Sequence, residues 1–233
     1  MKENDRGFTL IELICVTAIL GLITVSIFSF ILAGMGMAKE TKKSAALSEN
    51  SRTAIGKMKT DIMNCGTGIV GSNAVTVDAD GSVRYDNATS ESGTLQDLGS
   101  TFFLITKDGE TTSGNDTYTL SCYRYDSGSI YYGRAKGVAL SKSLTTKDAI
   151  DMCSPTHLLC PNVSVFQASV LSYGETVRDE KDGSVSTIVK ASRVHLILTL
   201  DKDDKSFHTQ QDVALRSETR FFNNFSDAFD AIG

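Results

Sequence analysis

The longest pattern in the chain is an apolar run over residues 8–38 that contains one charged side chain, Glu12. An α-helix rises about 1.5 Å per residue, and about 20 apolar residues cross the hydrocarbon core of a bilayer. A helix in the core of a soluble protein rarely stays apolar on all sides over such a length. The run therefore predicts a membrane-spanning helix, preceded by a short charged leader at residues 1–7.

Residues 39–64 follow with a mixed pattern that no proline interrupts. Apolar side chains recur here three and four residues apart, at Leu47, Ala54, Ile55, Met58, Ile62 and Met63. This period is typical of an amphipathic helix that packs one face against a protein core. We therefore expect the membrane helix to continue as an amphipathic helix that ends near Cys65.

Residues 65–233 change to short β-rich runs separated by turn residues. The runs predict three hairpins, 75–77 with 83–85, 118–125 with 129–134, and 188–200 with 207–215. Further strands are expected at 101–106 and 163–171, and residues 174–187 are expected to form a polar loop. Strands joined by short turns form antiparallel sheets that can cover a helix with one face. The sequence predicts an α+β fold, a long N-terminal helix packed on an antiparallel β-sheet head.

Composition and charge narrow the classes of function. The length of 233 residues suggests one or two domains, and 41% hydrophobic with 22% charged residues excludes a fully disordered chain or a polytopic transporter. The net charge of −5 argues against direct nucleic-acid binding. The three histidines lack metal-ligand spacing, and neither a P-loop nor a GxSxG motif occurs. We therefore expect no catalytic residues, no cofactor and no metal site.

The cysteines fall into two groups. Cys15 lies in the membrane run, where it is expected to act as a small apolar residue, and four more follow in the head. An even number outside the cytoplasm permits two disulfides with three connectivities. The favoured pair, Cys153 with Cys160, would close a short loop that holds Pro155 and ends beside Pro161, leaving Cys65 with Cys122. Four reduced, buried thiols are the alternative.

Four phenylalanines mark the C-terminal segment, Phe221, Phe222, Phe225 and Phe229. Three of them are spaced four residues apart, which is one helical turn. We expect a short terminal helix docked on its own head. The alternative is an exposed apolar patch for a partner subunit.

Glu12 is the unusual residue of the apolar run. A carboxylate near the bilayer centre costs about 2.5 kcal/mol or more, so Glu12 either reaches the headgroups or has a cationic partner in the membrane. It ends the motif Gly7-Phe8-Thr9-Leu10-Ile11-Glu12, which follows a short charged leader and begins the apolar run. This arrangement resembles the type III signal of type IV prepilins and pseudopilins.

The resemblance implies a processing site and a set of partners. A prepilin peptidase would cut after Gly7 on the cytoplasmic face, and the new terminus at Phe8 would be N-methylated. In the family, the glutamate that corresponds to Glu12 pairs with the terminal ammonium of a neighbouring subunit, and a paired charge is less costly in lipid than an isolated one. The implied partners are major and minor pilin subunits, the prepilin peptidase, the inner-membrane assembly platform and, before assembly, membrane lipid.

The same resemblance divides the chain into four segments. They are a cleaved leader at 1–7, a transmembrane and assembly helix at 8–38, an amphipathic helix at 39–64, and an extracytoplasmic head at 65–233. The implied location is the cytoplasmic (inner) membrane in a single pass, and a cell-surface or periplasmic filament after assembly.

The second half of the chain carries a weaker resemblance. A strand, a polar loop, the strand RVHLILTL at 193–200, a hairpin and the segment ALRSETR at 214–220 are similar to the heads of J-type pseudopilins and W-type minor pilins. The implied function is a minor pilin that acts at the filament tip or in initiation of assembly. A pseudopilin of a type II secretion or DNA-uptake system is one alternative. A single-pass membrane-anchored sensor or binding protein, from another class, is the other.

Overall fold

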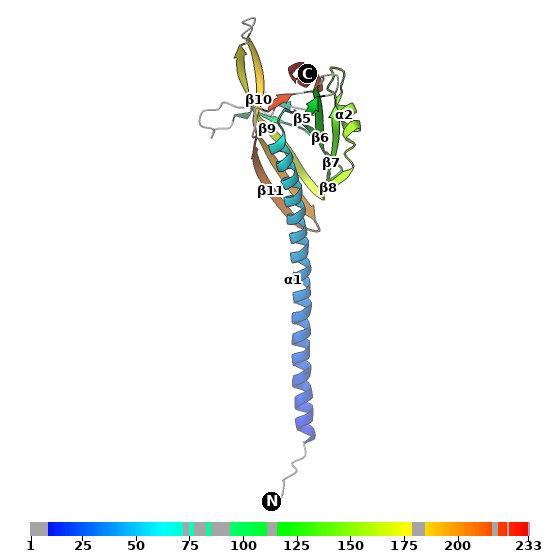
Figure 1. Cartoon of the computed structure of the whole chain (residues 1–233). Helices are drawn as coiled ribbons and strands as arrows, with labels where there is room; N and C mark the ends of the chain where they lie inside the picture. The colour runs from blue at the N-terminus through cyan, green and yellow to red at the C-terminus, as the bar shows by residue number, and fades with distance from the viewer. Residues whose placement is uncertain are drawn as a thin grey trace, which may run out of the picture. The chain divides into compact units, whose positions relative to one another are not determined.

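The computed structural model describes residues 9–71, 75–76, 83–84, 94–110, 116–178, 185–215, 219–222 and 224–232. The chain divides into two compact units, Met1–Ala46 and Leu47–Gly233. Helix α1 (Leu10–Asn64) runs through both units (Figure 1). Its N-terminal part makes up nearly all of the described residues of the first unit, and its C-terminal part is the first element of the second unit. The predicted long N-terminal helix is confirmed.

Within the second unit, α1 buries one face. The buried positions of the helix are Leu47, Ser51, Ala54, Ile55, Met58 and Ile62. Their spacing of three and four residues places them along one side of the helix. The predicted amphipathic segment is therefore confirmed, and α1 ends one residue before Cys65.

The second unit is built on one twelve-stranded sheet, ordered β2-β4-β9-β10-β12-β1-β5-β6-β7-β8, with β11 paired to β10 and β3 to β4. The strands are β1 (Gly68–Gly71), β2 (Val75–Thr76), β3 (Val83–Arg84), β4 (Thr94–Asp97), β5 (Thr101–Glu110), β6 (Asp116–Asp126), β7 (Ser129–Val138), β8 (His157–Pro161), β9 (Val163–Arg178), β10 (Val185–Lys202), β11 (Lys205–Ala214) and β12 (Arg220–Phe222). Strands β1 and β12 run parallel, and their neighbours pair antiparallel. This mixed, mostly antiparallel sheet and the long helix confirm the predicted α+β class.

Two of the predicted hairpins are confirmed by tight turns. Strands β6 and β7 are joined through Ser127 and Gly128, whose φ angles are 49° and 75°. Strands β10 and β11 are joined through Asp203 and Asp204, with φ angles of 48° and 63°. Two successive residues with positive φ match the twist of a two-residue hairpin turn.

Two predictions about the strands are wrong. In the described residues, β2 and β3 each pair with β4 and not with each other, and the predicted turn at 78–81 lies outside the described residues. The polar loop predicted at 174–187 instead contains the ends of β9 and β10, with Gly174 opposite Val189, and its residues 179–184 lie outside the described part. Strand pairing runs through the backbone, so polar side chains alone did not end these strands.

Two short helices complete the unit, and the sequence predicted one of them. Helix α3 (Phe225–Ile232) buries Phe225 and Ala228, which confirms the docked terminal helix. Helix α2 (Thr146–Cys153) was not predicted. It begins with a capping box in which Thr145 Oγ1 donates to Asp148 Oδ2 at 2.6 Å and the Asp148 N–H donates to Thr145 Oγ1 at 3.2 Å.

The sheet separates two apolar clusters because successive side chains of a strand point to opposite faces. On β5, Phe102 and Leu104 join the cluster that contains the buried face of α1, which we call the α1 cluster. Phe103 and Ile105 join the second cluster, which contains residues of α2 and α3 and which we call the α2/α3 cluster. The head is therefore a sheet with a helix layer on each face.

Candidate processing and assembly site

The first turn of α1 holds Glu12 in a closed hydrogen-bond arrangement. Glu12 Oε2 accepts from the Thr9 hydroxyl at 2.8 Å and from the Thr9 N–H at 3.0 Å. The Glu12 N–H lies 3.4 Å from Thr9 Oγ1. This is a capping box, in which two residues three apart satisfy each other's backbone donors at a helix start. The negative carboxylate also lies at the positive end of the helix dipole.

The other two processing residues lie just before this turn. Gly7 and Phe8 fall outside the described residues, and their roles stay predictions. In the sequence, only Phe8 lies between the expected cleavage point after Gly7 and Thr9. A cut there would therefore create a new amino terminus immediately before the residue that caps α1.

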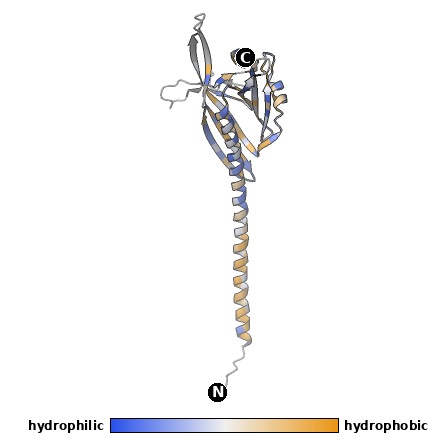
Figure 2. Cartoon of the chain, in the orientation of Figure 1, coloured by the Kyte–Doolittle hydropathy of each residue, from blue (hydrophilic) through white to orange (hydrophobic). Residues whose placement is uncertain are grey.

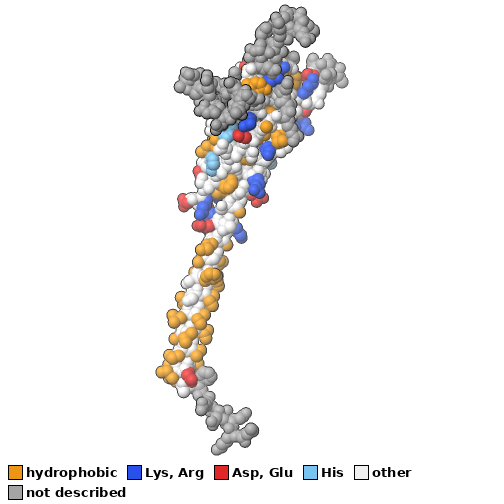
Figure 3. Space-filling model, turned by 90° about the vertical axis from the view of Figure 1, so that its left-hand side faces the viewer, with side chains coloured by type: hydrophobic (Ala, Val, Ile, Leu, Met, Phe, Trp, Pro, Cys, Tyr) orange, Lys and Arg blue, Asp and Glu red, His pale blue; other side chains and the backbone are white. Residues whose placement is uncertain are grey.

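The first unit presents an apolar surface on the helix. Large apolar side chains from Leu10 to Met37 are exposed, and they colour this part of the helix orange in Figure 2 and in the face shown in Figure 3. By length and composition, α1 is the one described helix that could cross a membrane. This surface near the N-terminus fits a single-pass membrane anchor.

Three hydroxyl side chains of the apolar segment, Thr17, Thr24 and Ser26, are bonded to backbone carbonyls of the helix itself. Thr24 Oγ1 donates to the Leu20 carbonyl at 2.7 Å, and Ser26 Oγ donates to the Leu22 carbonyl at 2.9 Å. Thr17 bonds in the same way to carbonyls of the preceding turn. Hydroxyl groups bonded back to the helix need no water, which suits them to a hydrocarbon environment.

The decisive comparison concerns this N-terminal segment. Residues 3–28 match the prokaryotic N-terminal methylation motif. This motif is the type IV prepilin-like signal, and the match supports membership of the pilin and pseudopilin superfamily. It implies processing by a prepilin peptidase and assembly with other pilin subunits. Proteins of this motif family are structural filament subunits and not enzymes. No curated protein and no solved structure is similar enough to the chain to count as a match.

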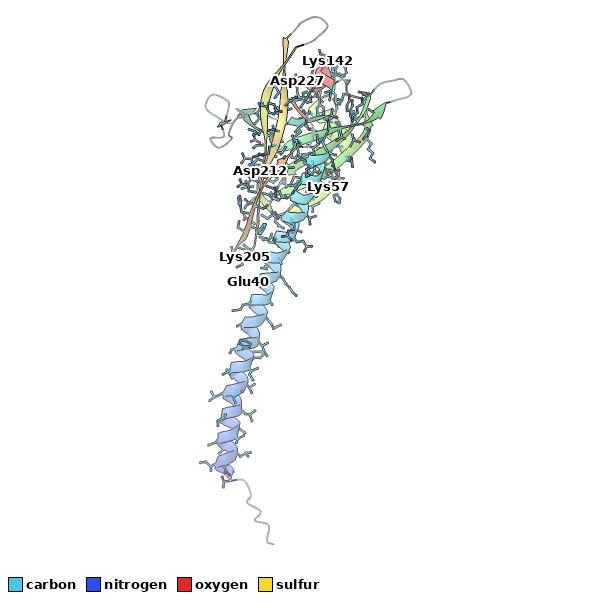
Figure 4. All side chains as sticks on the ribbon, turned by 60° about the vertical axis from the view of Figure 1, so that its left-hand side comes forward. Glu40, Lys57, Lys142, Lys205, Asp212 and Asp227 are labelled. Carbon is cyan, nitrogen blue, oxygen red and sulfur yellow. The ribbon has the colours of Figure 1, made fainter. Side chains whose placement is uncertain are left out.

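Downstream of the methylation motif, a polar cluster joins α1 to the sheet. Tyr123 of β6 donates its hydroxyl to Asp61 Oδ2 at 2.6 Å, and Lys57 Nζ lies 2.8 Å from Asp61 Oδ1. The Lys57 ammonium also lies 4.7 Å from the ring centre of Tyr132, and Figure 4 labels Lys57 on the part of α1 beside the strands. The hydrogen bond from Tyr123 to Asp61 and the cation–π contact of Lys57 with Tyr132 join α1 to β6 and β7, and the ion pair within α1 holds the Lys57 and Asp61 side chains together.

The charges of this polar cluster shift the pKa values of its members. Burial opposes the charge on Lys57, but the hydrogen bond and charge of Asp61, together with Tyr132, outweigh it and raise the lysine pKa. Burial, followed by the hydrogen bond to Asp61, raises the pKa of Tyr123 above its ordinary value. Tyr123 therefore stays protonated as a donor and Lys57 stays charged at neutral pH.

The four cysteines of the head are buried, two in each apolar cluster. Cys65 and Cys160 lie in the α1 cluster, whereas Cys122 and Cys153 lie in the α2/α3 cluster. The structure has all four as free thiols, and it does not bring Cys153 together with Cys160 or Cys65 with Cys122. The disulfide pairing stays a prediction. Cys15 is exposed on the apolar segment of α1.

The histidines form isolated polar contacts. His195 Nδ1 lies 2.5 Å from Asp212 Oδ1 across β10 and β11, and His208 Nδ1 lies 3.0 Å from Thr199 Oγ1. Asp212 also lies 3.8 Å from the Arg193 guanidinium. Among the described residues, no group of three or more His, Cys, Asp or Glu side chains could hold a metal ion. These contacts join neighbouring strands of one hairpin.

Sequence reasoning singled out Glu12 but missed Thr9 as its partner. The signal was present, because a threonine followed three residues later by a glutamate is the pattern of a capping box. The same pattern with aspartate, Thr145 and Asp148, marked the unpredicted helix α2. The link between Tyr123 and Asp61 had no local signal, because it joins residues 62 positions apart.

Proposed function

We propose that this chain is a minor pilin of a type IV pilus or a related filament. The observation that carries the proposal is the methylation motif at residues 3–28, which leads into an exposed apolar helix whose first turn holds Glu12. In this proposal, residues 1–7 are removed, Phe8 is methylated, and residues 8–38 insert first into the membrane and then into the filament. Residues 39–64 and the head from residue 65 lie outside the cytoplasm.

Glu12 has a role in assembly under this proposal. Before assembly, the Thr9 cap satisfies the carboxylate within its own chain. In a filament, the terminal ammonium of a neighbouring subunit offers an opposite charge in an apolar surrounding, where a close ion pair is strong. Exchange of the local cap for this ion pair would select one register between adjacent helices.

The size of the head supports a position of this chain at the filament tip or a role in the initiation of assembly. The second unit spans Leu47–Gly233 and has helices on both faces of its sheet. Such a head is large beside one helix, which favours a subunit present in few copies. The resemblance of residues 193–200 and 214–220 to J-type and W-type subunits points the same way.

The processing step is tested by intact-mass and N-terminal peptide analysis of the protein from its native membrane, with and without the prepilin peptidase. We expect a methylated Phe8 terminus that disappears in the peptidase mutant. Gly7→Leu should block the cut, because a bulky side chain replaces a small one at the cleavage site, and the matched Gly7→Ala should retain most of it. A Met1 terminus in both strains, with no effect of Glu12→Ala on assembly, would instead support a membrane-anchored sensor.

The position in the filament needs a separate measurement. Sheared filaments are quantified for this chain against the most abundant pilin, and labelled antibodies locate it on single fibres. We expect few copies, at fibre ends or in short initiating complexes. Even labelling along the fibre at the abundance of the major subunit would contradict the tip and initiation role.

A further inference from the structure

We propose that Cys122 and Cys153 are a disulfide pair, which closes when the head folds in an oxidising medium and ties helix α2 to strand β6. The pairing is a property of the head alone and does not depend on filament assembly. It differs from both pairs that the sequence favoured.

The first support is the position of α2 over one residue of β7. Gly133 lies directly opposite Cys122 in the β6–β7 ladder. A Cβ atom added to Gly133 would lie 2.3 Å from the Cys153 carbonyl oxygen and 2.7 Å from the Cα of Pro155. The C-terminal end of α2 therefore rests on the backbone of Gly133, and only a glycine leaves room for it.

The second support is the shared face of the two cysteines. In an antiparallel pair, residues directly opposite point to the same face, with Cβ positions about 4.5–5.5 Å apart. Cys122 therefore points to the face on which Cys153 rests against Gly133. Both cysteines belong to the α2/α3 cluster, and both are almost fully buried.

The third support is the position of the Cys153 sulfur. Its Sγ donates to the Leu120 carbonyl at 3.5 Å. Leu120 precedes Cys122 by two residues on β6 and lies in the same cluster. The Cys153 side chain is thus aimed at β6 near Cys122.

The alternative pairings are disfavoured by the same geometry. Cys65 and Cys160 belong to the α1 cluster, on the opposite face of the sheet. Cys65 Sγ donates to the Gly68 carbonyl at 3.1 Å and to the Ile105 carbonyl at 3.4 Å. A bond from Cys153 to Cys160, or from Cys65 to Cys122, would have to pass through the strands that separate the two clusters.

The ionisation of the two thiols indicates when the bond forms. Burial, followed by the nearby charge of Cys153, raises the pKa of the Cys122 thiol to about 12, and burial raises that of Cys153 to about 11. Disulfide exchange needs a thiolate, so the closed head is a poor substrate for it. The bond therefore forms during folding, before α2 covers β6, and burial of both sulfurs then slows attack by an external reductant.

The reaction is a thiol–disulfide exchange with a small or protein disulfide as oxidant. One cysteine thiolate attacks the oxidant and forms a mixed disulfide, which releases one thiol of the oxidant. The second cysteine thiolate then attacks the mixed disulfide and releases the other thiol. Two protein thiols lose two electrons and two protons, and the oxidant gains them as two thiols. Export of the head would place it where such oxidants are available.

The test is oxidative refolding of the full chain in detergent micelles with reduced and oxidised glutathione. Free thiols are trapped by alkylation in acid-quenched denaturant, and peptides are mapped without reduction. We expect a linked peptide pair containing Cys122 and Cys153, with Cys15, Cys65 and Cys160 alkylated. The oxidised chain should melt roughly 5–10 °C above a chain refolded with reductant, because the bond closes a loop of about 30 residues.

Four single variants to alanine complete the design, because alanine fits a buried apolar site. Cys122→Ala should release Cys153 to alkylation, and Cys153→Ala should release Cys122. The matched controls Cys65→Ala and Cys160→Ala should keep the bond and the melting difference. Alkylation of all five cysteines in the wild-type chain after refolding in oxidised glutathione, or any other linked pair, would overturn the proposal, and this result needs no variant to fold.

Discussion

The Tyr123 hydroxyl of strand β6 donates to the Asp61 carboxylate of helix α1 at 2.6 Å, and this bond joins the helix to the sheet. Tyr123 is fully buried, and its ring stacks on Phe102 with centroids 5.2 Å apart. The donor is therefore held rigidly, and the acceptor carries a charge. A hydrogen bond to a charged group is stronger than one between neutral groups.

Removal of this hydroxyl by Tyr123→Phe should lower the free energy of unfolding by about 1.5–3 kcal/mol. The change keeps the stacked ring but leaves Asp61 without its buried donor. The matched control is Tyr125→Phe, whose hydroxyl lies 3.3 Å from the neutral Val163 carbonyl and should cost about 1 kcal/mol or less. Urea unfolding of the purified chain in micelles measures both, and equal losses would contradict the special role of Asp61.

Gly133 should tolerate no side chain. Gly133→Ala places a methyl group against the backbone of Cys153 and Pro155, which cannot move aside as a flexible side chain can. We expect a loss of about 3 kcal/mol or more, with α2 losing protection from hydrogen exchange before the rest of the head. Gly109→Ala on β5 is the control, because nothing lies within 4 Å of its added Cβ, and it should change stability by less than about 0.5 kcal/mol. Similar losses at the two positions would contradict the close approach of α2.

The capping box of α2 should make the stability of that helix depend on acid pH. Hydrogen bonds from the Thr145 side chain and backbone lower the pKa of Asp148 from its ordinary value of 3.8. A carboxyl whose pKa is lowered on folding stabilises the folded state at pH above its unfolded value, and this contribution is lost as the pH falls through the lower folded value. Exchange protection of α2 amides should therefore fall below about pH 4.

Two variants separate this titration from general acid unfolding. Asp148→Asn should flatten the dependence of α2 on acid pH, because asparagine can cap the helix but does not titrate. Asp151→Asn, at an exposed position of the same helix, should leave the wild-type dependence in place. An unchanged profile in Asp148→Asn would assign the acid sensitivity to other carboxyl groups.

The first turn of α1 should distinguish capping from pairing between subunits. Thr9→Val removes the hydroxyl at nearly constant volume, which weakens the helix start by about 1 kcal/mol but leaves the Glu12 charge. Glu12→Ala removes the carboxylate half of the capping box together with the charge. If the proposed pairing sets the register of the filament, Glu12→Ala should abolish incorporation into sheared filaments, whereas Thr9→Val should only reduce it. Equal incorporation of the two variants would indicate that Glu12 serves as a cap alone.

The patterns that sequence reasoning used correctly were local. An unbroken apolar run and a three-and-four spacing predicted α1, and alternating side chains with turn residues predicted the β6–β7 and β10–β11 hairpins. The errors in the predicted strands arose where the polar composition of a segment suggested a loop but its backbone pairs as a strand. The polar residues around Gly174 suggested a loop, although the backbone ladder continues past them.

The site was predictable to the extent that it is a linear motif. Gly7, Phe8 and Glu12 could be named because the signal is contiguous in the sequence. The placement of the cysteines could not be derived from spacing, because Cys153 and Cys160 are close in the chain but belong to clusters on different faces of the sheet. Which face a cysteine occupies depends on strand register, and one residue of shift exchanges the two faces.

The back-bonded hydroxyls of Thr17, Thr24 and Ser26 have a consequence for the energetics of leaving the bilayer. Because these three hydroxyls take their partners from their own helix, they do not depend on lipid headgroups or water for a hydrogen bond. In the proposed filament, the segment would pass from lipid into a bundle of similar helices, and both surroundings are apolar. The hydration of its side chains would therefore change little. Glu12 is the one charged group of that run, so in the proposed filament the electrostatic part of the free-energy difference between the membrane-held and the assembled helix would depend on a single carboxylate.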